Sequence, residues 1–212
     1  IVQNVSPTGV AVLNATDPTV AAMAAKCRGS VTFFAVDKFH PVMATHRAQG
    51  QAVVYVENGQ IVASKGDLHQ TIALANIPIT MGGLIPFQVE NVMASVAAAW
   101  ALGLDWNTIR DGLAGFSNDT DNAQGRFNLF TFRGATVIAD YGHNPDAMIA
   151  LVQAVQAMPA KRRLVVISGA GDRRDQDIRQ QTEILGDAFD EVILYEDQCQ
   201  RGRQDGEVIA LL

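Results

Sequence analysis

The chain has 212 residues and a formal net charge of −6; 48% of its residues are hydrophobic and 18% are charged. This composition predicts a globular protein with apolar material for one large domain or two small ones; the acidic balance argues against a broad nucleic-acid surface, and without an apolar run of about 18 residues we expect no membrane span. The two cysteines, Cys27 and Cys199, have no metal-binding or disulfide spacing, so we expect a reducing, cytoplasmic setting.

The first half of the chain alternates apolar runs, typical of buried parallel strands, with helical segments. Asp17 suits the N-cap of the first helix, and Asp105 suits the N-cap of the last helix in this half. The pair Asn58-Gly59 predicts a tight hairpin turn, and Gly103 ends a long Ala-rich helix. The expected elements are strand 9–15, helix 18–27, strand 30–36, helix 39–49, hairpin strands 52–56 and 61–64, a strand region at 68–79, and helices 87–102 and 106–113.

A polar segment rich in Asn, Asp and Ser, residues 115–124, separates this half from the next. We place a domain boundary there, with one domain at residues 1–117 and the other at residues 118–212. The second half repeats the alternation. Its expected elements are strands 127–132 and 136–139 around a turn, helix 147–158, strand 164–167, helix 175–189 and strand 191–195. Strands that alternate with helices indicate an α/β fold with a parallel, doubly wound sheet.

A polar cluster follows the predicted strand 136–139. Asp140, His143 and Asn144 lie where the ligands of open α/β sheets bind, at the carboxyl end of a strand. Asn144 and Pro145 suit the N-cap and the first position of the next helix, whose amino end can face an anion. The cluster therefore predicts a nucleotide or phosphate site. The alternative is a loop in which the same residues only cap the helix and bond to each other.

A second loop of this kind follows strand 164–167 and reads Ser168-Gly169-Ala170-Gly171-Asp172-Arg173-Arg174-Asp175. Its small residues would let the backbone approach a ligand closely. The loop lacks the Gly-Lys-Ser/Thr of a P-loop, and a plain turn with solvated charges is the alternative. Basic residues are concentrated here and at residues 161–163 and 201–203, a distribution that fits a small anionic ligand better than a polynucleotide.

Other candidate residues stand apart from these two loops. Asn14 and Asp17 follow the first strand, either beside a nucleotide site or as local capping residues. Asn91, on the long apolar helix, either reads the edge of an adenine ring or faces solvent near the start of the helix. Arg126 offers a planar fork for a phosphate or carboxylate, and the alternative is a surface residue.

Taken in order, these motifs resemble the Mur ligase superfamily, and in particular the Mur-ligase-like part of cyanophycin synthetases. The motifs are Val12-Leu13-Asn14-Ala15-Thr16-Asp17-Pro18, Asn91 with Ala97-Ala98-Ala99, Gly125-Arg126-Phe127, Asp140-Tyr141-Gly142-His143-Asn144-Pro145, Gly171-Asp172-Arg173-Arg174-Asp175, and the ending from Leu185 to Arg203. The resemblance implies an ATP-dependent amide ligase: ATP phosphorylates the β-carboxyl of a poly-aspartate (cyanophycin) primer, and the α-amine of arginine attacks the acyl phosphate. It also implies Mg²⁺, upstream domains of the same polypeptide and a homo-oligomer.

The resemblance further implies a role for each matching residue. Residues 1–117 would be the later part of a P-loop-type central domain, and residues 118–212 most of a Rossmann-like lid that closes over ATP. Asn91 would contact adenine, Arg126 the phosphates and Asp140 the ribose, with His143 and Asn144 in the same pocket. Arg126 and His143 are the candidate catalytic residues, and Asn14 and Asp17 would lie beside the nucleotide. The turn of Asp172, Arg173, Arg174 and Asp175 would face the cleft near the incoming amine.

Two departures from the family pattern keep other functions open. Thr16 stands where the family has an aspartate in Asn-Ala-Asp-Asp-Pro, and the Gly-rich P-loop and the carbamylated lysine do not occur in this chain. The chain opens at Ile1 without an initiator methionine, so we expect a piece of a longer protein with these parts, and most metal ligands, upstream. The alternatives are a muramyl-peptide or folylpolyglutamate ligase of the same superfamily, or a catalytically silent module with a structural or polymer-binding role.

Overall fold

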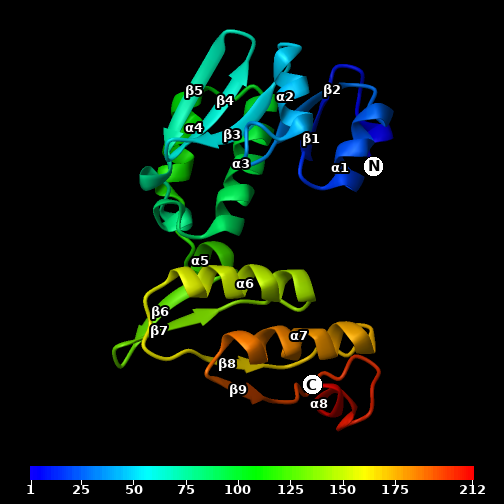
Figure 1. Cartoon of the computed structure of the whole chain (residues 1–212), viewed down its shortest axis with the longest axis vertical. Coiled ribbons are helices and arrows are strands. Elements are labelled where there is room, and N and C mark those ends of the chain that lie inside the picture. The colour runs from blue at the N-terminus through cyan, green and yellow to red at the C-terminus, as the bar shows by residue number, and fades with distance from the viewer. The chain divides into compact units, whose positions relative to one another are not determined.

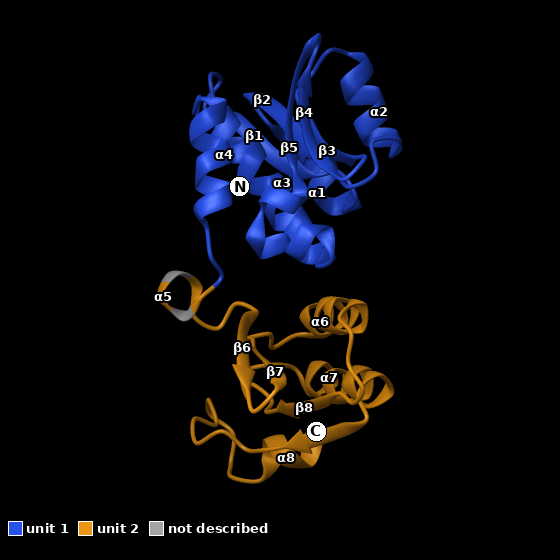
Figure 2. Cartoon of the chain, turned by 90° about the vertical axis from the view of Figure 1, so that its left-hand side faces the viewer, with its two compact units in different colours: residues 1–118 blue, residues 119–212 orange. Residues whose placement is uncertain are grey.

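In a computed structural model, the chain divides into two compact units, residues 1–118 (unit 1) and residues 119–212 (unit 2), shown in Figure 2. The structure describes residues 1–212 except for the side chains of Thr120 and Asn122. Both units combine strands and helices along the chain (Figure 1), which confirms the α/β fold class expected from the sequence. None of the described helices combines the length and the apolar character that a membrane span requires.

Unit 1 is built on a five-stranded sheet with the strand order β1-β2-β3-β4-β5. Strands β1, β2 and β3 are parallel, and β3, β4 and β5 pair antiparallel. The strands are β1 (Val10–Asn14), β2 (Ser30–Phe34), β3 (Val53–Glu57), β4 (Gln60–Lys65) and β5 (Leu68–Ala73). Asn58 and Gly59 join β3 to β4 with φ values of 50° and 72°. Two consecutive positive φ values are what a type I′ hairpin turn needs, and they confirm the predicted turn.

Two of the helices of unit 1 begin at the caps that the sequence predicts. The Asp17 carboxylate accepts hydrogen bonds from the amides of Thr19 and Val20, and Asp105 caps its helix in the same way. The helices are α1 (Pro18–Ala22), α2 (Pro41–Ala48), α3 (Pro86–Ala101) and α4 (Trp106–Gly115), with 3-10 helices η1 (Val2–Asn4), η2 (Met23–Lys26), η3 (Leu74–Asn76) and η4 (Pro78–Gly83). The expected helix 18–27 thus divides into α1 and η2, and the strand region 68–79 ends at Ala73, before the η3 turn.

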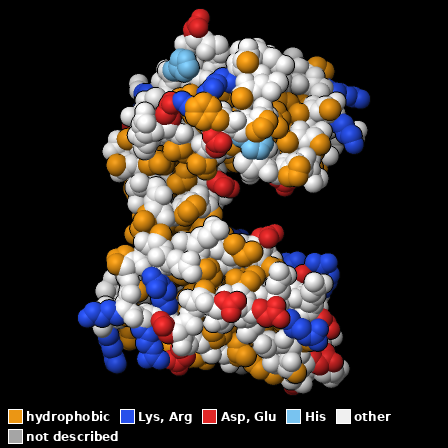
Figure 3. All heavy atoms as spheres, viewed as in Figure 1, with side chains coloured by type: hydrophobic (Ala, Val, Ile, Leu, Met, Phe, Trp, Pro, Cys, Tyr) orange, Lys and Arg blue, Asp and Glu red, His pale blue; other side chains and the backbone are white. Residues whose placement is uncertain are grey.

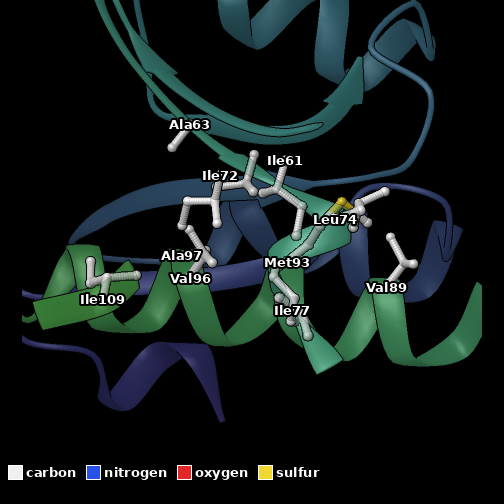
Figure 4. Packing of buried hydrophobic residues seen from close by; sticks show 12 residues of the cluster. Ile61, Ala63, Ile72, Leu74, Ile77, Val89, Met93, Val96, Ala97 and Ile109 are labelled. Carbon is white, nitrogen blue, oxygen red and sulfur yellow. The ribbon is translucent and has the colours of Figure 1, made fainter. Parts of the chain in front are cut away.

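Two apolar clusters cover the two faces of this sheet. On one face, α3 packs Val89, Met93 and Val96 against strand residues that include Ile61 and Ile72, as Figure 4 shows. On the other face, the buried side chains include Ala11, Leu13, Phe33, Met43, Val53 and Tyr55. Fully burying one such aliphatic or aromatic side chain is worth about 1.5–3 kcal/mol, so both faces contribute to the stability of the unit.

Unit 2 contains two strand pairs and four helices. Strands β6 (Asn128–Phe132) and β7 (Ala135–Ala139) form an antiparallel hairpin, and β8 (Leu164–Ile167) and β9 (Glu191–Leu194) are parallel. The helices are α5 (Thr120–Ala123), α6 (Pro145–Ala157), α7 (Asp175–Ala188) and α8 (Glu207–Leu211). Helices α6 and α7 pack on each other, and Met148, Ile167 and Leu185 are buried between the helices and strands β8 and β9. The sequence analysis did not predict the short helices α5 and α8.

Candidate functional site

Three loops of unit 2 meet around a pocket of about 190 Å³. They follow β7, β8 and β9, and two of these strands are parallel, so their carboxyl ends share one edge. The loop residues that line the pocket are Asp140, Tyr141, Gly142, His143, Ser168, Gly169, Ala170, Tyr195, Asp197, Cys199 and Arg201. Apolar side chains of the unit 2 core, such as Met148 and Leu185, line the rest. The two polar loops predicted from the sequence, after β7 and after β8, therefore lie together.

Asp140 ties the first loop to the segment that precedes β6. One oxygen of its carboxylate accepts a hydrogen bond from the Phe127 amide at 2.8 Å, and the other accepts from the Gly142 amide at 2.6 Å. Phe127 is buried and has a φ of 54°, a left-handed conformation that is strained for a bulky residue. The amide of Tyr141 donates to the carbonyl of Gly125 at 2.8 Å. Asp140 thus stabilises a strained turn in addition to lining the pocket.

His143 and Asn144 have different surroundings although they are neighbours. The Nδ1 atom of His143 lies 2.9 Å from the carbonyl oxygen of Tyr141, and its Nε2 atom contacts the guanidinium of Arg173. The Tyr141 and His143 rings lie 5.3 Å apart between centroids. The Asn144 side chain accepts from the Ala147 amide at 2.9 Å and caps α6, with Pro145 in the first turn. This is the cap that the sequence predicts; a ligand contact by Asn144 stays a prediction.

Arginines connect the loop after β8 to the loop after β9. Arg203 donates to the carbonyls of Gly171 and Arg173 and to the carboxylate of Asp175, each at 2.8 Å. Arg201 donates to both oxygens of Asp172 at 3.1 and 3.2 Å, and to the Tyr141 hydroxyl at 2.5 Å. No individual role for Arg201 or Arg203 was predicted from the sequence. Their position a few residues beyond the strand 191–195 was the available signal.

The ion pairs of these loops shift several pKa values. Partial desolvation raises the pKa of Asp172, but the hydrogen bond and charge of Arg201 outweigh it, and the net pKa lies below the usual value. The Tyr141 hydroxyl and then Asp172 raise the pKa of Arg201. A hydrogen bond from Arg174, opposed by partial desolvation, holds the pKa of Asp177 below its usual value. These groups therefore stay charged near neutral pH, as paired ions.

The four residues of the turn that was predicted to face the cleft have different partners. Asp172 and Asp175 are paired with Arg201 and Arg203, and Arg173 contacts His143. Arg174 points elsewhere: its guanidinium makes a two-point bond with Asp177 at 2.7 and 2.9 Å, and its side chain is 80% exposed. None of these four residues is among those lining the pocket. Arg173 and Asp172 instead contact His143 and Arg201, which do line the pocket.

The remaining candidates lie apart from this pocket or in the other unit. Arg126 is an exposed residue of unit 2 whose amide donates to the Ala123 carbonyl at 3.2 Å. In unit 1, the Asn14 side chain accepts from the amide and hydroxyl of Thr16 at 2.9 and 2.7 Å, and Asp17 caps α1. Asn91 is exposed on α3 and donates to the buried Gln88 at 3.2 Å. A nucleotide contact for each of these residues stays a prediction.

The charged side chains of unit 2 are mixed in sign, and Figure 3 shows acidic and basic groups interspersed on the visible face. Among the described residues, no three His, Cys, Asp or Glu side chains are grouped so as to hold a metal ion.

Residues 125–211 match the family described as Mur ligase, glutamate ligase domain. The chain is 39% identical over its whole length to cyanophycin synthetases of Geminocystis herdmanii and Synechocystis sp., and it spans about a quarter of their length (24%). It is 30% identical over 88% of its length to UDP-N-acetylmuramoyl-L-alanyl-D-glutamate–2,6-diaminopimelate ligase of Bacillus licheniformis, of which it covers 35%.

Solved structures show the same fold. A Mycobacterium tuberculosis folylpolyglutamate synthase, in complexes with ADP and AMPPCP, matches 99% of this chain and 44% of its own with a TM-score of 0.65 and 22% identity. MurF from Acinetobacter baumannii matches 92% of this chain and 40% of its own with a TM-score of 0.62 and 19% identity. At these identities the likeness concerns the fold.

Proposed function

We propose that the chain is part of an ATP-dependent amide ligase, because residues 125–211 match the family described as Mur ligase, glutamate ligase domain, and the whole chain is similar to cyanophycin synthetases. The similarity to cyanophycin synthetases, 39% over the whole chain, is the observation that carries the choice of reaction. In the proposed reaction, the γ-phosphoryl group of ATP passes to the β-carboxylate of a poly-aspartate primer, releasing ADP. The α-amine of arginine then attacks the acyl phosphate, which forms the amide and releases phosphate.

The pocket of unit 2 supports a ligand site for this reaction. Asp140 uses each of its two oxygens for one backbone amide, and a carboxylate oxygen has two lone pairs, so both oxygens keep room for a ribose hydroxyl. Arg126 is exposed three residues after α5 and fits the proposed role of stabilising charge on the transferring phosphoryl group. Asn91 would meet the adenine, with Asn14 and Asp17 beside the nucleotide.

The proposed reaction requires ATP and Mg²⁺. ATP, when bound, supplies the phosphoryl group that activates the carboxylate; Arg126, Asp140 and Asn91 are the residues here that would hold it. We also propose, as the resemblance implies, that most of the Mg²⁺ ligands lie upstream of Ile1 and that the complete protein is a cytoplasmic homo-oligomer.

Another Mur-superfamily ligase is the second candidate, and the 30% identity to the Bacillus licheniformis enzyme supports it. That enzyme's name specifies 2,6-diaminopimelate as its amino acid. The higher identity and fuller coverage of the cyanophycin synthetases favour arginine and poly-aspartate for this protein. The third candidate, a catalytically silent module, rests on Thr16 alone among the residues of this chain.

Incorporation of labelled arginine by the complete protein tests the proposal. The assay contains ATP, Mg²⁺ and a poly-aspartate primer carrying arginine, and parallel reactions replace arginine and the primer with diaminopimelate and a muramyl peptide, or with glutamate and a folate. We expect arginine in the polymer and one ADP released per residue added. Release of ADP only with diaminopimelate and a muramyl peptide, or only with glutamate and a folate, would select the second candidate. No ADP with any of these substrates would select the silent module.

A further inference from the structure

We propose that Arg173 is a positioning residue that holds His143 in one orientation and in one neutral tautomer. In this role His143 lines the pocket and holds the Tyr141 carbonyl, and it transfers no proton. The proposal about the tautomer concerns this chain alone, whereas its consequence for turnover rests on the proposed ligase function.

The two contacts of the His143 ring fix which nitrogen carries the hydrogen. Nδ1 lies 2.9 Å from the Tyr141 carbonyl oxygen, which can only accept, so Nδ1 donates. Nε2 contacts a terminal nitrogen of the Arg173 guanidinium, which can only donate, so Nε2 accepts. The neutral tautomer with hydrogen on Nδ1 is the one protonation state that satisfies both contacts. A protonated ring would direct an N–H group at another cation.

The surroundings of Arg173 show that this contact is specific. Its amide donates to the Ala170 carbonyl at 3.0 Å, and its own carbonyl accepts from Arg203 at 2.8 Å, so the backbone is held on both sides. Its Nε atom is buried and has no hydrogen-bond partner among the described residues. The neighbouring Arg174 instead pairs with Asp177 and is largely exposed. Arg173 is therefore directed into unit 2, with His143 as the acceptor that the structure gives its side chain.

His143 lines the pocket whereas Arg173 does not, so Arg173 acts from behind the ring. A general acid or base needs a nitrogen within hydrogen-bond reach of the proton that it transfers. Both nitrogens of His143 are already committed to Tyr141 and Arg173, and what remains for a ligand is the carbon edge and the face of the ring. The Nδ1 contact also holds the backbone carbonyl of Tyr141, and the side-chain hydroxyl of Tyr141 accepts from Arg201 at 2.5 Å.

Nitrogen NMR of the histidine rings tests the tautomer directly in this chain. Long-range ¹H–¹⁵N spectra of the ¹⁵N-histidine-labelled protein at pH 7.5 distinguish the two neutral tautomers and the cation, and His143→Gln assigns the signal among the four histidines. We expect the Nδ1–H form in the wild type, and a shift toward a tautomer mixture in Arg173→Met. The matched control Arg174→Met removes an equivalent charge one residue away and should leave the His143 signal unchanged.

Either of two NMR results would overturn the proposal: an Nε2–H ring or an imidazolium in the wild type, or a His143 signal that Arg173→Met does not move. Circular dichroism of each variant checks that it is folded. If Arg173→Met does not fold, Arg173→Lys replaces it, and the expected result is a partial shift because lysine keeps the charge and loses the planar donor.

Kinetics in the complete ligase separate positioning from proton transfer. His143→Asn keeps a donor near the Nδ1 position, and His143→Gln places an acceptor near the Nε2 position. We expect both variants to raise KM by a larger factor than they lower kcat, with Gln closer to wild type because it can still bind Arg173. A loss of kcat of about 100-fold in both variants would instead show proton transfer. If the wild type itself forms no amide bond, the proposed function fails, and the NMR result still decides the role of Arg173.

Discussion

Replacing Gly171 by alanine tests how the loops around the pocket are held together. A Cβ atom at this position would overlap the carbonyl oxygen of Gln200, and this obstacle is backbone, so no side-chain rotation relieves it. The loops after β8 and β9 would have to separate. That movement would strain or break the two bonds of 2.8 Å from Arg203 to the Gly171 and Arg173 carbonyls.

The expected cost follows from these two effects. Overpacking against a fixed obstacle costs about 1–3 kcal/mol, and each lost hydrogen bond costs about 1 kcal/mol. Part of the bonding would survive in a shifted loop, so we expect Gly171→Ala to lower the free energy of unfolding of unit 2 by roughly 2–4 kcal/mol. Gly186→Ala is the matched control, because Gly186 lies within α7 and an added Cβ would meet nothing within 4 Å. We expect the control to stabilise by about 0.5–1 kcal/mol.

The assay must report on unit 2 separately, since a single transition is not assured for a chain with two compact units. Both tryptophans, Trp100 and Trp106, lie in unit 1, so their fluorescence during urea denaturation follows that unit. Hydrogen exchange of peptides from β8 and α7 follows unit 2. If Gly171→Ala and Gly186→Ala change the exchange of unit 2 equally, or if Gly171→Ala costs less than about 0.5 kcal/mol, the reasoning from the Gln200 contact is wrong.

Four further predictions concern unit 2. Gln181 is fully buried and its Oε1 has no partner among the described residues, so Gln181→Met should raise the free energy of unfolding by about 1 kcal/mol in urea denaturation; a loss of that size would indicate an unseen partner such as buried water. Asp140→Asn should raise the KM for ATP in the complete ligase and speed the hydrogen exchange of the Phe127 turn, because an amide cannot accept at both positions; an unchanged ATP dependence with faster exchange would leave Asp140 a structural role only. Arg126→Ala should lower the rate of arginine incorporation far more than it lowers the melting temperature, and an unchanged rate would remove Arg126 from the catalytic residues. The pKa of Asp172 is lowered in the folded chain, so its contribution to stability is present above its unfolded value of about 3.9 and is lost as the pH falls through the lower folded value; Asp172→Asn should flatten the stability of unit 2 against pH below about pH 4, and an unchanged slope would contradict this.

Local signals allowed much of the fold to be predicted from the sequence. The Asn58-Gly59 turn and the caps at Asp17 and Asn144 depend on contacts within three residues, and all of them form as expected. Helix α8 was missed because it has only five residues and packs through the buried Val208, which neighbouring residues do not reveal. Its formation depends on tertiary contact with α7 rather than on helix propensity.

The site was predictable to the extent that its residues follow strands. The loops after β7 and β8 were each expected to be ligand-binding loops at the carboxyl end of a strand, and both contribute residues to the pocket. The partners within that edge were not predictable, because they are far apart in the sequence: Arg173 is 30 residues from His143, and Arg201 is 60 residues from Tyr141. No periodicity or motif spacing encodes such pairs, and only the packed unit brings them together.

The arginines of unit 2 have structural contacts that their clustering did not predict. Clusters of basic residues were expected to meet a small anionic ligand, yet the guanidinium groups of Arg162, Arg174 and Arg201 pair with Glu191, Asp177 and Asp172. Arg163 and Arg203 donate mainly to backbone carbonyls, at the end of α6 and in the loop after β8. Planar, multidentate donors are suited to holding several loop carbonyls and carboxylates at fixed positions. Asp172 occupies the Nη1 nitrogen of Arg201, so an anion that binds this guanidinium competes with the negative charge of Asp172, and the affinity of the site depends on that ion pair as well as on the ligand.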